Sequence, residues 1–212
     1  MLSGPEPEDP RPDDPRRFSP SAARNRDPIL AVLRAHLPQR GTVLEVASGS
    51  GEHIVHLATA MGDDLLFQPS EADGEARASI DAWAREMRCR NVLPALALDA
   101  TAWPWPIASA DAVLCINMIH IAPWQATVGL MRGAASVLAP GGLLYLYGPF
   151  TVAGAHTAES NAAFDASLRA RDPAWGVRDL DTLAEAARAA GFAAPEVVPM
   201  PANNLSVLFR RA

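Results

Sequence analysis

The chain has 212 residues, 49% of them hydrophobic, and a formal net charge of -6. This suits one domain with a sizeable core, and the acidic charge argues against non-specific binding to nucleic acid or anionic membranes, because Lys and Arg supply most of that affinity. No run of 18 apolar residues predicts a transmembrane helix, and the two cysteines are typical of reduced thiols in a cytoplasmic protein.

The first residues mix Pro, Asp, Glu and Arg with almost no apolar content. We expect residues 1–17 to form a disordered tail, because they have nothing to bury against the entropy cost of ordering. Residues 18–212 are expected to form a single domain. Within it, Ser19-Pro20 and Asp27-Pro28 each pair an N-cap residue with proline, and the second pair opens a helix over residues 29–36 that ends before Pro38.

From residue 43 onward, apolar strand patterns alternate with helical patterns, which favours a parallel sheet covered on both faces. Only Pro201–Asn204 separates the last two strands, so they are expected to form an antiparallel hairpin. The predicted fold class is α/β, a Rossmann-like doubly wound seven-stranded sheet, mostly parallel with a C-terminal antiparallel hairpin. The expected strands are residues 43–47, 65–68, 92–98, 112–117, 143–147, 196–200 and 205–210, and the expected helices after residue 43 are residues 52–60, 74–88, 123–138, 159–169 and 180–190.

The loop after the first strand has a distinctive sequence, Ala47-Ser48-Gly49-Ser50-Gly51. Its two glycines allow positive φ and a close approach of a ligand to the backbone, and the following helix directs its free N–H groups toward that ligand. A dinucleotide fingerprint would need glycine where Ile54 stands, and a P-loop would need a lysine. The loop resembles that of class I S-adenosylmethionine (SAM) methyltransferases, which bind a nucleoside without phosphates.

Acidic residues lie in or just after the last part of each of the first three strands, where ligands bind in an open parallel sheet. By that resemblance, Glu45 organises the loop or reaches the methionine amino group, and Ala47 replaces the usual first glycine. Glu71, with Ser70 and Asp73 close by, is the candidate for the ribose hydroxyls, although the same residues suit an N-cap. Asp99, followed by Ala100, is the candidate for the adenine amino group.

Asn117 and His120 follow the fourth strand, which borders the transferable methyl group in the resembled fold. They can orient or deprotonate a nucleophile, since histidine transfers protons near neutral pH. His120 can equally well pack against the cofactor or cap a neighbour. No Pro-Pro-aromatic sequence follows Asn117, so the signature of amino-methyltransferases is absent. His53 and His56 share a helix face, but no further ligand completes a metal site.

Longer runs resemble the methyltransferase-like protein 26 family. This resemblance implies the fold and SAM binding, and it leaves the substrate open. It also draws attention to polar residues suited to a substrate lid, although Arg169 can simply pair with Asp165 at helical spacing. The runs include residues 19–30, 45–53, 68–70, 115–120, 146–150, 175–179 and 200–204, and the lid candidates are Arg24, Asn25, His156, Asn161, Arg169, Trp175 and Arg178.

We therefore expect a cytoplasmic SAM-dependent methyltransferase, monomeric or homodimeric, that acts on a small molecule and needs no metal, membrane or nucleic acid. The alternatives are a protein or RNA methyltransferase, with a basic groove built from Arg16, Arg17, Arg24 and Arg26, or a SAM-binding regulator without turnover. The catalytic candidates are His120, Asn117, Tyr147 and His156. The cofactor candidates are Glu45, Ala47, Ser48, Gly49, Gly51, His53, Ser70, Glu71, Asp99, Ala100, Asn117, Arg24 and Asn25.

Overall fold

A computed structural model of the protein describes residues 14–212. Along the chain, helices and strands alternate as the sequence predicts, with one additional group of short strands after β5. The elements are α1 (Pro20–His36), β1 (Gly41–Val46), α2 (Glu52–Met61), β2 (Leu65–Glu71), α3 (Gly74–Glu86), β3 (Leu96–Ala97), β4 (Ala110–Ile116), η1 (Met118–His120), α4 (Trp124–Val137), β5 (Leu138–Gly148), β6 (Phe150–Val152), β7 (Ala155–His156), α5 (Glu159–Arg171), β8 (Arg178–Asp179), α6 (Leu180–Ala189), β9 (Glu196–Met200), η2 (Pro201–Asn203) and β10 (Asn204–Arg210).

The main sheet has seven strands in the order β3-β2-β1-β4-β5-β10-β9. β1 pairs in parallel with both β2 and β4, so the strand order reverses between β1 and β4. β10 lies antiparallel to both β5 and β9. The predicted doubly wound sheet and its C-terminal hairpin are therefore confirmed, and the carboxyl ends of β1, β2 and β4 meet at the reversal point where such folds bind ligands.

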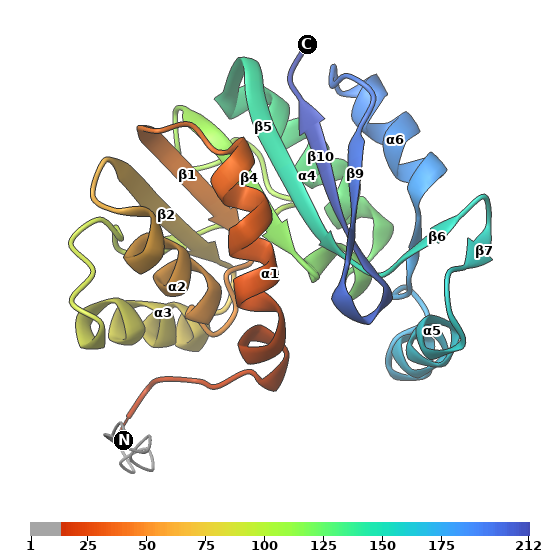
Figure 1. Ribbon diagram of the computed structural model, residues 1–212, viewed down its shortest axis with the longest axis horizontal. Helices are drawn as coiled ribbons and strands as arrows, with labels where there is room; N and C mark the ends of the chain where they lie inside the picture. Colours follow the sequence, from red (N-terminus) through yellow and green to blue (C-terminus); the bar gives the residue numbers. More distant parts are fainter. Residues whose placement is uncertain (1–13) are drawn as a thin grey trace.

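Helices cover both faces of this sheet (Figure 1). Apolar residues of α1, α2 and α3 form one core with one face of the sheet, around the buried side chains of Ile29, Ile54 and Ile80. Those of α4 and α6 form a second core on the other face, around Leu130 and Leu183. The strands between them are apolar on both faces, as expected for parallel strands buried from both sides.

Most elements differ from their predicted bounds by a few residues, and two of them depart further. α1 is one helix that starts at Pro20, where Ser19 caps its start, and it contains Pro28. Its buried residues after Pro28, which are Ile29, Leu30 and Leu33, pack in the first core. The predicted strand over residues 92–98 is reduced to β3 and an isolated bridge between Val92 and Phe67. Pro94 lies between these two contacts, and proline cannot donate a backbone hydrogen bond to a ladder.

The segment between β5 and α6 forms a small layer of its own. Strands β7, β6 and β8 make a three-stranded sheet in that order, and α5 lies beside it (Figure 1). The sequence predicts α5 but not these strands, because two or three residues are too few to display a strand's alternation.

The expected disordered tail, residues 1–17, lies mostly outside the described residues. The part that is described, residues 14–17, contacts α3, so the boundary at residue 17 needs correction. The backbone N–H of Arg17 donates to Ser79 Oγ over 2.8 Å, and Trp83 Nε1 donates to the Arg17 carbonyl over 2.9 Å. Arg16 also stacks 5.1 Å from the Trp83 ring centre. These contacts give the segment apolar surface to bury, which composition alone does not reveal.

Candidate functional site

The loop from Ala47 to Gly51 connects β1 to α2, and all three of its small residues Ala47, Gly49 and Gly51 have positive φ (58°, 57° and 93°). The two glycines serve different purposes. A Cβ on Gly51 would lie 2.8 Å from the Cα of Ile80, whereas a Cβ on Gly49 would have nothing within 4 Å. Gly51 is therefore needed for the packing of α3, and only Gly49 fits the expectation of a backbone open to a ligand.

Glu45 lies beneath this loop at the end of β1 and is 1% exposed. Its Oε2 atom has no hydrogen-bond partner in residues 14–212. Burial raises the pKa of Glu45 to about 7; a contact with Ser48 opposes this rise, and the nearby Glu71 carboxylate adds to it. A carboxylate held in this way attracts a cation or a hydrogen-bond donor.

Ser48 and Ser70 hold the loop in place. Ser70 Oγ donates to the Glu45 carbonyl over 2.7 Å, and Ser48 Oγ donates to the same oxygen over 3.3 Å. Ser48 is 6% exposed and Ser70 is 0% exposed. The structure therefore gives both hydroxyl groups a structural partner, and neither is directed at solvent.

Glu71 lies at the end of β2 and is tied to the loop. Its Oε2 accepts the Gly49 N–H over 3.0 Å, and its Oε1 accepts the Ala72 N–H over 2.8 Å. Asp73, by contrast, is the N-cap of α3 and accepts from the N–H groups of Glu75 and Ala76. Of the three polar candidates after β2, Glu71 is thus the one whose carboxylate adjoins Gly49.

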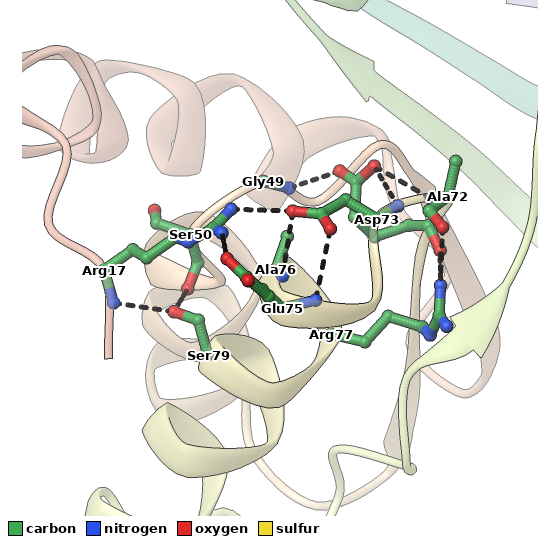
Figure 2. A network of polar contacts seen from close by, with 10 residues as sticks. Arg17, Gly49, Ser50, Ala72, Asp73, Glu75, Ala76, Arg77 and Ser79 are labelled. Carbon is green, nitrogen blue, oxygen red and sulfur yellow. Dashed lines mark hydrogen bonds and ion pairs between the residues drawn. The ribbon is translucent and has the colours of Figure 1, made fainter. Parts of the chain in front are cut away.

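Arg17 connects the N-terminal segment to this region (Figure 2). Its guanidinium contacts the carboxylates of Asp73 at 2.9 Å and Glu75 at 2.7 Å. Ser79, which accepts from the Arg17 N–H, donates in turn to the Ser50 carbonyl over 2.7 Å. The segment before α1 is thereby linked to the glycine loop through α3, a link that no local pattern in the sequence indicates.

After β3, Asp99 is exposed and forms a tight turn. Its Oδ1 accepts from the backbone N–H and the hydroxyl of Thr101, both over 2.8 Å. Its Oδ2 has no hydrogen bond within the described chain and is free to accept another. Ala100 is buried, and its carbonyl meets α4 at Gly129, where a Cβ would collide with it.

Helix α1 contributes Asn25 to the same edge of the sheet. His53 Nε2 lies 2.7 Å from Asn25 Oδ1, and burial lowers the pKa of His53 to about 4. Tyr147, at the end of β5, accepts from Asn204 Nδ2 over 3.0 Å. Burial raises the pKa of Tyr147, and contacts with Asn25 and Asn204 oppose that rise. Arg24, which precedes Asn25 in α1, is exposed.

Asn204 is the member of this group that sequence reasoning missed as a functional candidate. It is distant from Tyr147 in sequence, and its pattern Asn203-Asn204 indicates only a turn. The signal needed to find it is the pairing of β10 with β5, which aligns Leu205 with Gly148.

After β4, Asn117 adopts positive φ (64°) and its N–H donates to the Tyr147 carbonyl over 2.8 Å. His120 is 1% exposed. Its Nδ1 accepts from the Arg178 N–H over 3.3 Å, and its ring packs edge-on 5.0 Å from Phe150.

His120 Nε2 has no partner among the described residues and lies against Gly148, where a Cβ would collide with it. Burial, and secondarily the charge of Arg178, lowers the pKa of His120 to about 3. A neutral, enclosed imidazole of this kind is poorly suited to accept a proton near pH 7. In the structure, His120 packs against Phe150 and accepts from the Arg178 N–H.

The remaining lid candidates divide into two groups. His156, on β7, has a side chain 31% exposed whose Nε2 lies 3.8 Å from Asp165 Oδ2. Arg169 Nε donates to the same Asp165 oxygen over 2.9 Å. Arg178 and Asn161 instead donate to backbone carbonyls, those of Ile119, Ala122 and Asn203 among them, so their side chains attach the small layer to η1 and η2. Trp175 stacks with Arg171.

Histidine, cysteine and acidic side chains in residues 14–212 are the potential ligands for a metal ion. No group of three or more His, Cys, Asp or Glu residues in this range is arranged to hold a metal ion. His56, the second histidine of the pair considered above, contacts Asp27 at 2.8 Å. None of the described helices has the length and apolar character needed to cross a membrane.

Residues 16–211 match the model of a family described as "Protein of unknown function (DUF938)". The chain belongs to this family. The match spans every element that builds the site, from the segment before α1 to β10.

Solved methyltransferase structures share the architecture of this DUF938 protein. It is similar to an O-methyltransferase family protein from Burkholderia thailandensis (TM-score 0.76, 17% identity, 91% of this chain and 57% of that one). It is also similar to mitomycin 7-O-methyltransferase (0.76, 15%, 91% and 54%) and to human N-acetylserotonin methyltransferase in complex with SAM (0.75, 11%, 91% and 53%). The chain spans little more than half the length of these proteins. At such identities the likeness establishes the class I methyltransferase fold.

Proposed function

We propose that this DUF938 protein is a SAM-dependent methyltransferase that acts on a small-molecule nucleophile in the cytoplasm. The observation that carries the proposal is the open Gly49 backbone beside Glu71 at the reversal point of the sheet. We also propose that the chain is a relative of the methyltransferase-like protein 26 family and that residues 18–212, with the contacting residues 14–17, form a single domain.

The residues present fit SAM in one specific respect. SAM carries a cationic amino group, and Glu45 offers a buried carboxylate oxygen without a partner under the loop. Gly49 leaves the space beside that loop clear of protein atoms. Glu71 and Asp99 supply carboxylate oxygens at the next two strand ends, where ribose and adenine would bind. The hydroxyls of Ser48 and Ser70, in contrast, support the loop from below.

When bound, SAM supplies an activated sulfonium methyl group. The task of the protein is then to align the acceptor and exclude water, and positioning of this kind can contribute up to about 7–11 kcal/mol. Asn117 and Tyr147 are the polar groups at the ends of β4 and β5 that can orient an acceptor. His156 is the candidate that takes a proton, because it is partly exposed and has the Asp165 carboxylate nearby.

Calorimetric titration with SAM, S-adenosylhomocysteine and NAD tests the cofactor assignment. We expect micromolar binding of the first two and none of NAD, because Ile54 is fully buried where a dinucleotide site needs glycine. Gly49→Leu should abolish binding. Gly141→Leu is the matched control, since Gly141 also has positive φ (82°) and a Cβ added there would meet nothing within 4 Å, but it lies outside the site. Equal SAM binding by both variants would contradict the proposal.

A transfer experiment separates a small-molecule enzyme from its alternatives. Radiolabelled SAM is incubated with the protein and a cell extract, and label is counted in the small-molecule, protein and RNA fractions. The basic groove that a macromolecular substrate would need is weakened in the structure, because Arg16 and Arg17 contact Asp14, Glu86, Asp73 and Glu75. We expect label in the small-molecule fraction. Binding of SAM without transfer to any fraction would favour a regulator.

A further inference from the structure

A concave surface lies at the edge of the sheet opposite the glycine loop. Its volume is about 630 Å³, and it is formed by the C-terminal half of α3 and the segment that leads to β3. α3 starts beside the end of β2 and runs back along the sheet, and Val92 pairs with Phe67 in the first half of β2. A neighbouring hollow of about 280 Å³ shares Arg88, Cys89 and Arg90 with it. We call the two together the arginine hollow.

Positive charge predominates here, although the whole chain has a net charge of -6. Arg85, Arg88 and Arg90 line the larger hollow and face one carboxylate, Asp81. Asp81 Oδ1 is already occupied by the Ala95 N–H at 2.9 Å. Asp63 lines the smaller hollow. Within residues 14–212, no carboxylate forms an ion pair with any of the three arginines. Arg85 Nε donates to the Asp81 carbonyl over 3.1 Å, which leaves its two terminal nitrogens for an anion.

The backbone at Arg88 is unusual. Cys89 N–H donates to the Ala84 carbonyl over 3.0 Å. This bond is typical of a helix C-terminus at which the residue just before the donor has a left-handed backbone conformation. That left-handed residue is Arg88, with φ 53°, where glycine is strongly favoured. An arginine is therefore kept at a strained position whose conformation glycine would adopt freely, which suggests that its side chain has a use.

The walls of the hollow are apolar. Ala84, Val92, Leu93 and Pro94 line it together with the arginines. Its volume falls within the range of small-molecule sites, which are mostly apolar with a few polar groups that fix orientation. Guanidinium forks bind phosphate oxygens in pairs, and an apolar floor favours a flat organic group.

We propose that the arginine hollow binds a phosphate monoester that carries a flat apolar group, at a site separate from the cofactor edge. Arg85, Arg88 and Arg90 hold the phosphate, and the apolar walls contact the organic group. The proposal does not depend on the methyltransferase assignment, because none of these residues belongs to the Gly49 loop or to the strand ends around it.

Cys89 provides a local readout. It lines both parts of the arginine hollow and is partly exposed, whereas the other cysteine, Cys115, is 1% exposed. The rate at which a maleimide modifies Cys89, followed by mass spectrometry, should therefore report occupancy of the hollow. The probe is 1-naphthyl phosphate, with 1-naphthol and inorganic phosphate as its two halves.

We expect 1-naphthyl phosphate to slow Cys89 modification several-fold and in a saturable manner, with each half much less effective. Protection by naphthol alone, or equal protection by inorganic phosphate, would overturn the proposal. So would protection by RNA in the absence of any effect of 1-naphthyl phosphate, because it would assign the hollow to a polymer.

Variants of Arg88 test the site without the risk of unfolding. Arg88→Gly removes the charge and relieves the backbone, so its stability in urea should equal or exceed that of the unaltered protein, while its affinity for 1-naphthyl phosphate falls roughly tenfold or more. Arg188→Gln, an exposed arginine of α6, is the charge control and should bind normally. Unchanged protection in Arg88→Gly would overturn the proposal.

Discussion

The backbone N–H of Gly49 donates to the carboxylate of Glu71 over 3.0 Å, which ties the loop after β1 to the end of β2. Glu71 therefore shapes the loop as well as offering an oxygen to a ligand. The two roles can be measured separately. The first affects the stability of the protein without a ligand, and the second affects only its affinity for SAM.

Replacing Glu71 by Gln should affect both roles. In glutamine, an NH2 group that cannot accept a hydrogen bond replaces one of the two accepting oxygens. We therefore expect the free energy of unfolding in urea to fall by about 1 kcal/mol. SAM affinity in calorimetry should fall about tenfold if the same carboxylate binds the ribose. Glu75→Gln is the control, since its side chain is 86% exposed and contacts only Arg17 among these groups. Equal SAM affinities in the two variants would remove Glu71 from the cofactor site.

Ala47→Gly should stabilise the protein. Ala47 has a φ of 58°, and a residue with a Cβ is disfavoured there by about 1–2 kcal/mol. Glycine also increases the conformational entropy of the unfolded chain, which offsets part of this gain in stability. The expected net gain in the free energy of unfolding is roughly 0.5–1 kcal/mol. Urea unfolding measures it. Ala60→Gly, inside α2, should instead lose about 1 kcal/mol. A loss of stability in Ala47→Gly comparable to that control would contradict the expectation.

Glu45 should make stability and SAM binding depend on pH. Its pKa is raised from 4.5 to about 7, so the folded state holds the proton more tightly. The associated stability is fully present below the unfolded pKa of 4.5 and is lost as the pH rises through about 7, with a total on the order of 3 kcal/mol. The difference between the original protein and Glu45→Gln, measured by urea unfolding from pH 4.5 to 8, should show this slope.

Binding of cationic SAM should favour the ionised form of Glu45. Calorimetry near pH 6, repeated in buffers of different ionisation enthalpy, should therefore detect proton release on binding. Glu45→Gln should release none. Proton release of the same size in both proteins would assign it to another group.

His120→Ala should lower stability by about 2–4 kcal/mol, because it leaves a cavity beside Phe150 and removes the acceptor for the Arg178 N–H. The pKa of His120 is lowered from 6.5 to about 3, so its contribution is present above pH 6.5 and is lost as the pH falls toward 3. Thermal unfolding measures the loss. If methyl transfer in folded His120→Ala keeps the pH profile of the original protein, His120 is a structural residue. Loss of the acidic limb, which is the fall in rate at low pH, would identify it as the base.

The architecture follows from the sequence because alternating apolar strands and helices have few ways to bury their faces. The order of strand ends also locates Glu45, Glu71 and Asp99 at one edge of the sheet. What sequence cannot supply is the distance between elements. Gly49 and Gly51 look equivalent in the loop, yet only Gly51 meets α3.

His120 illustrates the same point for chemistry. As a residue type after β4 it suggests proton transfer, but its burial, and secondarily the charge of Arg178, lowers its pKa. Likewise, Pro28 looks like a helix start in the sequence. In the structure, α1 packs on α2 and continues through Pro28. The link from Arg17 through Ser79 to Ser50 is invisible for the same reason, since it joins three separate segments.

The position of β10 affects how the protein is made. β10 is synthesised after the other strands of this sheet, yet it inserts between β5 and β9. Until residues 204–210 leave the ribosome, a nascent chain presents the long edge of β5 with its backbone groups unpaired. Unpaired edges are sites of intermolecular pairing, so this sheet should depend on chaperones during translation more than one built strand by strand from its N-terminus.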